Sequence, residues 1–300
     1  MGIFGRIDTF ITWFDGVVWG LPLIILILVT GIFLTVRLGL LQVRYLGKAL
    51  KFMVKNEEDG HGEVTSFGAL CTALSATIGT GNIVGVATAI SAGGPGALFW
   101  MWVAAFFGMA TKYAEGFLAV RYRTIDEEGH VLGGPFYYIE NGMGHKWKWL
   151  AKVFSFFGAC VGLFGIGTFT QVNGIASAVQ SFFDPNKEDT VSILGTDYSI
   201  AIVITAFALA ICVGLVVIGG IKRISSVSQV IVPFMAILYI VTVLVLIVTN
   251  IEKLPGALAT IVEYAFGVKA VAGGVLSSIA ISMQKGIARG IFSNEAGLGS

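Results

Sequence analysis

The chain has 300 residues, of which 56% are hydrophobic and 12% are charged, and its formal net charge is +1. Soluble domains carry about 25% charged residues, so this composition excludes an ordinary soluble protein. The near-neutral charge also gives no electrostatic reason to expect a nucleic acid as partner.

Long uncharged tracts predict an all-α integral membrane protein. Apolar residues at helical spacing over residues 1–16, with Arg6, Asp8 and Asp15 between them, first predict a short helix on the membrane surface; an irregular leader is the alternative. Because about 20 apolar residues suffice to cross a bilayer, the tracts that follow predict about seven transmembrane helices. These predicted spans are 17–36, 65–92, 95–120, 151–183, 198–220, 225–250 and 258–284.

Lys and Arg residues collect in alternate loops of this span order. They follow the first, third, fifth and seventh spans, and the last of these groups is Lys285 and Arg289. Because basic residues accumulate on the cytoplasmic side, this pattern predicts an inner (plasma) membrane protein with its amino terminus outside and residue 300 inside. All 3 histidines fall in inside loops, which argues against a relay of titrating groups that carries protons across the membrane.

Glycines interrupt the second predicted span near mid-membrane. Gly79 and Gly81 flank Thr80, and glycine is a poor residue for a helix interior. An opened backbone in a bilayer persists only where it lines a cavity inside the protein, so a break here indicates a binding site. The outer half-helix would present free N–H groups and its positive dipole end to an anion such as an amino-acid carboxylate. A packing seam of small residues is the alternative.

Polar residues around this break could complete the site. The backbone carbonyls that end the inner half-helix, at about Ile78, would suit Na⁺ or a substrate ammonium, together with Thr77 and Asn82. Gln171 stands near the middle of the fourth predicted span, where an amide should face protein or a cavity. It is a candidate substrate contact, with hydrogen bonding between helices as the alternative.

The seventh predicted span contains a second glycine pair, Gly273 and Gly274, which fits a break or close helix packing equally well. The step from the second span to the seventh is five helices, so the two cross the membrane in opposite directions. Five helices followed by five inverted ones is the repeat of the leucine-transporter-like fold. The sequence therefore predicts one transporter domain over 1–300, with an extra helix and basic inside loop over 17–64, a first repeat over 65–250 and the start of an inverted second repeat over 251–300.

Ionisable residues are scarce inside the predicted spans. Glu115 lies near the inner end of the third span, three residues after Lys112, which predicts an interfacial ion pair; a role in ion coupling is the alternative. The sequence shows no nucleophile elbow, zinc-binding helix or phosphate loop, so it does not support an enzyme.

Three ungapped motifs resemble the sodium:alanine (alanine or glycine:cation) symporter family, and the similarity extends over essentially the whole chain. They are TIGTGNIVGVA at 77–87, GGPGALFWMW at 93–102, which continues through Gly108, and FSNEAGLGS at 292–300. The resemblance implies a Na⁺-coupled symporter that imports small neutral amino acids, alanine or glycine, across the bilayer by alternating access. Members of that family continue for several more helices, so the resemblance also implies that the chain is the amino-terminal part of a longer transporter.

The resemblance also assigns roles to residues near the two breaks. By similarity to the wider leucine-transporter-like fold, Thr77 and Asn82 would contribute to a sodium site near the substrate. A second sodium site would use Ser75 and Ile78, through backbone carbonyls. The substrate carboxylate would be received at Gly79, Thr80 and Gly81 with Gln171 nearby, and Gly273 and Gly274 would line the other side.

Two other functions stay open at this stage. A proton-coupled amino-acid permease would respond to a pH gradient and be indifferent to sodium. A non-transporting sensor or assembly subunit on a transporter scaffold would bind ligand without flux.

Overall fold

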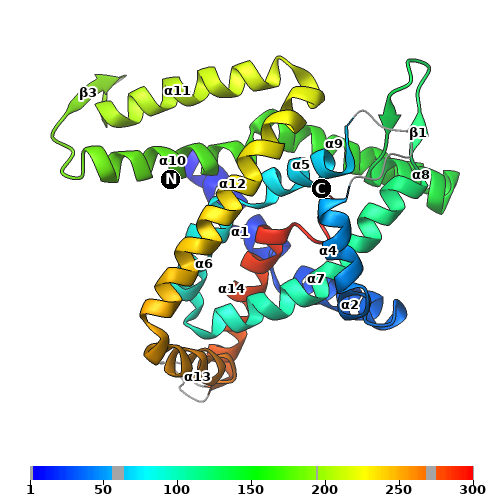
Figure 1. Cartoon of the computed structure of the whole chain (residues 1–300), viewed down its shortest axis with the longest axis horizontal. Coiled ribbons are helices and arrows are strands. Elements are labelled where there is room, and N and C mark those ends of the chain that lie inside the picture. The colour runs from blue at the N-terminus through cyan, green and yellow to red at the C-terminus, as the bar shows by residue number, and fades with distance from the viewer. Residues whose placement is uncertain (1–2, 56–63, 194, 268–274, 300) are drawn as a thin grey trace. The chain divides into compact units, whose positions relative to one another are not determined.

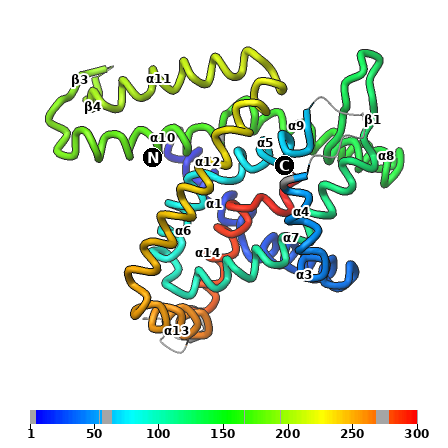
Figure 2. The backbone as a smooth tube through the Cα atoms, viewed as in Figure 1, coloured from blue at the N-terminus to red at the C-terminus, as the bar shows by residue number. Residues whose placement is uncertain are grey.

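A computed structural model shows an almost entirely helical chain (Figures 1 and 2). It describes residues 3–55, 64–193, 195–267 and 275–299. The chain divides into two compact units. The first comprises residues 1–54, 81–123 and 237–300, and the second comprises residues 55–80 and 124–236.

The first unit is organised around α7, because α14, α2 and α13 all pack against this helix. It also holds the carboxyl-terminal part of α12, which begins in the second unit, and α6 without its first residue, Thr80, which belongs to the second unit. The elements of this unit are α1 (Ile3–Val18), α2 (Leu21–Arg37), α3 (Leu41–Arg44), α4 (Leu46–Val54), α6 (Thr80–Gly93), α7 (Gly96–Arg121), the 3₁₀ helix η2 (Ile251–Lys253), α13 (Leu254–Ala265) and α14 (Val275–Asn294).

Small residues bring α14 close to α7. Gly286 and Gly290 lie one turn apart on α14, and a Cβ at Gly290 would lie only 3.1 Å from the Cβ of Ala104. This spacing lets two membrane helices approach backbone to backbone. Beside the seam, Ile24 of α2 and Ile287 of α14 are buried in the core of the unit.

The second unit contains two hairpins and the helices that flank them. Helices α10 and α11 lie side by side, joined by the antiparallel β3–β4 hairpin (Figure 1). The elements are α5 (Ser66–Thr77), β1 (Thr124–Ile125), β2 (Val131–Leu132), α8 (Pro135–Met143), the 3₁₀ helix η1 (His145–Trp147), α9 (Lys148–Phe164), α10 (Ile166–Phe183), β3 (Thr190–Ile193), β4 (Thr196–Ser199), α11 (Ile200–Val217) and α12 (Gly220–Thr249).

A carboxylate at the end of α10 ties the β3–β4 hairpin to the helix. The Ser199 hydroxyl donates to Asp184 Oδ2, and the Glu188 N–H donates to Asp184 Oδ1 at 2.9 Å. These donors, the Ser199 hydroxyl first, hold the pKa of Asp184 below its ordinary value because they favour the ionised carboxylate.

Five helical stretches in the described part of the chain are long and apolar enough to cross a membrane. They agree with or overlap five predicted spans, and α7 is a continuous helix of 26 residues where the span 95–120 is predicted. The helix predicted over 1–16 is present as α1. The chain is therefore an all-α protein with several helices suited to a bilayer. The five stretches are Gly5–Arg37, Ser66–Gly93, His145–Phe183, Ile200–Val217 and Gly220–Thr249.

The fourth predicted span, 151–183, is not one helix. Helix α9 ends at Phe164 and α10 begins at Ile166, with Gly165 between them in the left-handed conformation (φ 59°). Glycine adopts this conformation without steric cost, so it can end a helix inside an apolar tract that carries no polar signal.

The seventh predicted span, 258–284, corresponds to two helices. Helix α13 ends at Ala265 and α14 runs to Asn294, and the predicted break at Gly273 and Gly274 lies outside the described residues. The prediction that Lys285 and Arg289 lie in a loop after this span is wrong, because both belong to α14, while their place on the inside stays a prediction.

The packing of α14 shows where these two cations lie along the bundle. A Cβ at Gly93, the last residue of α6, would lie 2.9 Å from the Cβ of Lys285, and Gly290 packs on Ala104. Lys285 and Arg289 are therefore level with the first half of α7. Both side chains lie on the exposed face of α14, and the face with the glycines is buried. A helix that contains two cations can therefore still pack against α7 through its opposite face.

Candidate functional site

The backbone opens where the glycines of the second predicted span indicate. Helix α5 ends at Thr77 and α6 begins at Thr80. Between them Ile78 is extended (φ −87°, ψ 103°), and its N–H makes a last hydrogen bond of 2.7 Å to the Leu74 carbonyl. The final carbonyls of α5 and the first N–H groups of α6 therefore lie outside a helical ladder, as at any helix end.

One side chain from α10 reaches the start of α6. The Thr80 N–H donates to Gln171 Oε1 at 3.0 Å. A helix amino terminus carries a partial positive charge, so a neutral amide oxygen here occupies a position that would favour an anion. The structure thus brings together Thr80 and Gln171, two of the residues that the sequence predicts for the site.

Gly79 makes room for the Gln171 amide. A Cβ at position 79 would lie 2.7 Å from Gln171 Oε1 and 2.8 Å from its Cδ, closer than atoms can pack. Gly79 is not among the residues with a left-handed backbone, so space explains the glycine and backbone conformation does not.

Gly174 is a part of this arrangement that the sequence pattern did not reveal. It follows Gln171 by one turn on α10, and a Cβ there would lie 3.5 Å from the Cβ of Thr80 and closer to its methyl group. Gln171 and Gly174 are three residues apart and so share one face of α10. That spacing could have indicated a close contact with another helix, but only if the partner helix had been known.

Asn82, in the first turn of α6, carries a buried Oδ1 that has no hydrogen-bond partner among the described residues. An unpaired buried acceptor costs about 1–3 kcal/mol, so it calls for a water or an ion as partner. A neutral amide oxygen is a ligand type that hard cations accept.

The hydroxyls at the end of α5 bond back to their own helix. Thr77 Oγ1 donates to the Ala73 carbonyl at 3.2 Å, and Ser75 Oγ donates to the Thr72 carbonyl at 2.6 Å. A hydroxyl that donates its hydrogen keeps lone pairs for a cation, so both oxygens retain ligand capacity.

A second group of polar contacts fixes the residues that follow α14. Glu115 Oε1 accepts the N–H groups of Gly297 and Gly299, each at 3.1 Å, and Glu115 Oε2 lies 3.6 Å from Lys112 Nζ. Both glycines have a left-handed backbone (φ 89° and 76°), and such turns form concave anion sites of N–H groups. The predicted pair of Glu115 with Lys112 is present, and the sequence pattern did not reveal the two glycine partners.

The fold and the site define a helical membrane protein with a polar opening inside one of its spans. The sequence profile of the Sodium:alanine symporter family matches residues 5–300. The chain belongs to this family, as its motifs predicted.

Known relatives agree with this assignment. The chain is 52% identical over 295 residues, 98% of this chain and 61% of the relative, to an uncharacterized transporter of Haemophilus influenzae. It is 48% identical over 287 residues, 94% of this chain and 59% of the relative, to the sodium/alanine symporter AgcS of Methanococcus maripaludis. It is 39% identical over 291 residues, 97% of this chain and 55% of the relative, to the putative sodium/proton-dependent alanine carrier protein YrbD of Bacillus subtilis. The chain thus spans less than two thirds of the length of these curated relatives.

Proposed function

We propose that the protein is a symporter that couples import of a small neutral amino acid, alanine or glycine, to sodium entry by alternating access. Family membership supports the transporter class, and the similarity to the sodium/alanine symporter AgcS supports sodium and alanine. The main support for a binding site at the opening between α5 and α6 is the hydrogen bond from the Thr80 N–H to Gln171 Oε1.

The substrate carboxylate takes the place of Gln171 Oε1 on the Thr80 N–H in this proposal. Charge-assisted hydrogen bonds are about twice as strong as neutral ones, so a carboxylate competes well with the amide at a helix amino terminus. The displaced Gln171 can then offer Nε2 as a donor to the same carboxylate. The backbone of Gly79, Thr80 and Gly81 would surround the carboxylate, and Gly273 and Gly274 would line the opposite side.

Sodium is bound by oxygen atoms near this opening. We assign Thr77 and Asn82 to a site near the substrate, and the unpaired Oδ1 of Asn82 supports its part in it. A second site would use Ser75 and Ile78, whose carbonyls lie in the last turn of α5 or directly after it. In this proposal the chain adopts a leucine-transporter-like fold, with a first repeat over 65–250 and an inverted second repeat that begins in 251–300.

Uptake of radiolabelled alanine into proteoliposomes tests this function. We expect accumulation only with an inward sodium gradient, and we expect Asn82→Ala to raise the sodium concentration that gives half-maximal uptake. Asn173→Ala is the matched control, because Asn173 is an exposed amide on α10. Uptake that does not depend on sodium and follows a pH gradient would instead establish the proton-coupled permease, the second candidate, which the similarity to the putative sodium/proton-dependent carrier YrbD supports.

A further inference from the structure

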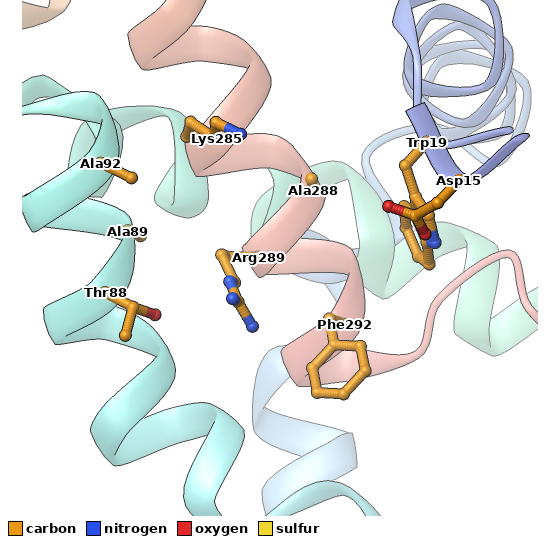
Figure 3. A pocket seen from close by; sticks show the side chains of 9 residues that line it. All are labelled: Asp15, Trp19, Thr88, Ala89, Ala92, Lys285, Ala288, Arg289 and Phe292. Atoms are coloured by element: carbon orange, nitrogen blue, oxygen red, sulfur yellow. The ribbon is translucent and has the colours of Figure 1, made fainter. Parts of the chain in front are cut away.

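A polar groove crosses the exposed face of α14 in the first unit (Figure 3). It lies among α1, α6 and α14, has a volume of about 400 Å³, and has the small side chain of Ala288 at its floor. None of the residues proposed for amino-acid or sodium binding lines it.

The charges in this groove are arranged in two places. Lys285 and Arg289 lie one turn apart on α14, and Arg289 extends into the space between α14 and α6 (Figure 3). Asp15 turns its carboxylate toward α14 from the side of α1. In the part of the chain that the structure describes, none of these three side chains forms an ion pair. The groove therefore presents two positive charges that have no ion-pair partner among the described residues and, across from them, one negative charge; the Arg289 guanidinium lies over the Phe292 ring, 6.0 Å from its centroid.

The groove lies at the end of α6 and near the start of α2, beside the middle of α14. Thr88 is in the last turns of α6, Trp19 lies two residues before the start of α2, and Lys285 packs beside Gly93, the last residue of α6. Helix ends that cross a bilayer lie at its surface, and tryptophan is enriched at that depth. The groove therefore opens at the level of the lipid headgroups.

An apolar surface continues from the groove. Ile11 and Val18 lie one turn before and one turn after Asp15 on α1, and both are exposed, as is Leu21 at the start of α2. Exposed apolar side chains on a surface helix and at the start of a span are suited to acyl chains.

We propose that this groove binds the headgroup of a phospholipid that carries both a phosphate and a primary ammonium, such as phosphatidylethanolamine. Arg289 and Lys285 donate to the phosphate oxygens, and arginine is especially suited to phosphate because its planar group donates in pairs. The ammonium donates to Asp15, and the acyl chains lie along α1 and α2. A choline headgroup lacks N–H donors for Asp15, and a glycerol headgroup lacks the positive charge.

Lipid retention tests the proposal. The purified chain is placed in nanodiscs with equal amounts of phosphatidylethanolamine, phosphatidylcholine and phosphatidylglycerol, then extracted in mild detergent, and the lipids that stay bound are counted by mass spectrometry. We expect phosphatidylethanolamine to be enriched, and we expect Arg289→Gln or Lys285→Gln to reduce its retention about tenfold because a charge-assisted hydrogen bond is lost. Lys51→Gln, an exposed lysine of α4, should change nothing.

A second variant separates lipid recognition from a folding defect. Asp15→Asn changes an exposed residue of α1, so it should leave the elution volume in gel filtration unchanged. It should remove the preference for phosphatidylethanolamine over phosphatidylglycerol while total phospholipid retention persists. Equal retention of the three lipids by the unaltered chain would overturn the proposal, and so would an unchanged preference in Asp15→Asn. Displacement of the bound lipid by millimolar free alanine would also overturn it, because the groove would then be an amino-acid site.

Discussion

Gly79→Ala should expel the Gln171 amide from the start of α6. The new Cβ would lie 2.7 Å from Gln171 Oε1 and 2.8 Å from its Cδ, distances that force one group to move. The amide is the far end of a flexible side chain, so it will rotate before the backbone shifts. The Thr80 N–H then loses the 3.0 Å hydrogen bond that the structure shows.

The cost of Gly79→Ala follows from that lost hydrogen bond. A neutral hydrogen bond contributes about 0.5–1.5 kcal/mol net, and an unsatisfied buried donor costs about 1–3 kcal/mol. Because Thr80 is only half-buried, we expect the free energy of unfolding to fall by about 1–2 kcal/mol. Gly81→Ala is the matched control, since its Cβ would lie 3.4 Å from the nearest atom of the Phe292 ring, an ordinary contact. Alanine is the better helix former, so this control should keep or raise stability.

A double-mutant cycle with Gln171→Ala isolates the interaction. Unfolding of the purified chain is followed by circular dichroism during denaturant titration in mixed micelles. In the Gln171→Ala background Gly79→Ala should cost nothing, because no amide remains to be displaced. Additivity within about 0.5 kcal/mol would refute the reasoning, since independent sites add to that precision. An equal cost for Gly81→Ala would refute it as well, because the loss would then come from glycine replacement in general.

Further tests address uptake, the residues after α14, and the hairpin. Gly79→Leu should abolish alanine uptake while membrane insertion stays intact, and normal uptake would exclude the opening as the substrate site. Glu115→Ala should increase hydrogen exchange at residues 297–299 and lower stability by about 2 kcal/mol, because two backbone donors lose a charged acceptor; unchanged exchange would show that the carboxylate does not hold this turn. Ser199→Ala should raise the pKa of Asp184 toward its ordinary value of about 3.9. The hydroxyl stabilises the ionised form, so its contribution to the thermal midpoint should be present at pH 7 and be lost as the pH falls through the folded pKa; a difference between the two proteins that does not shrink as the pH falls below about 3.9 would contradict this cause.

The opening between α5 and α6 could be predicted because it is a local property of the sequence. Gly79 and Gly81 stand in an apolar tract that is otherwise suited to a continuous helix, and glycine disfavours the helix at those positions. The family motifs over the same residues were confirmed by the profile match over residues 5–300. The roles of these residues in binding remain predictions.

The partners of the opening could be predicted only in part. Gln171 was expected near it because an amide in a span must face protein, but its contact with the Thr80 N–H depends on the packing of α10, which no local pattern specifies. Gly165 divides the fourth predicted span without any change in hydropathy, so a prediction based on the length of apolar tracts could not detect this break. The contact of Glu115 with Gly297 and Gly299 joins residues more than 180 positions apart, as the separations of 182 and 184 show.

The spacing of glycines distinguishes close helix packing from a break in a helix, which hydropathy alone does not. Successive helical residues turn by about 100°, so glycines four apart share a face and glycines two apart lie on nearly opposite faces. Gly286 and Gly290 follow the first spacing, and both pack against one neighbour, α7. Gly79 and Gly81 follow the second spacing and cannot form one seam; the first meets Gln171 and the second meets Phe292. The alternative of a packing seam therefore fits Gly286 and Gly290 of α14 and fails at the opening, where the helix ends.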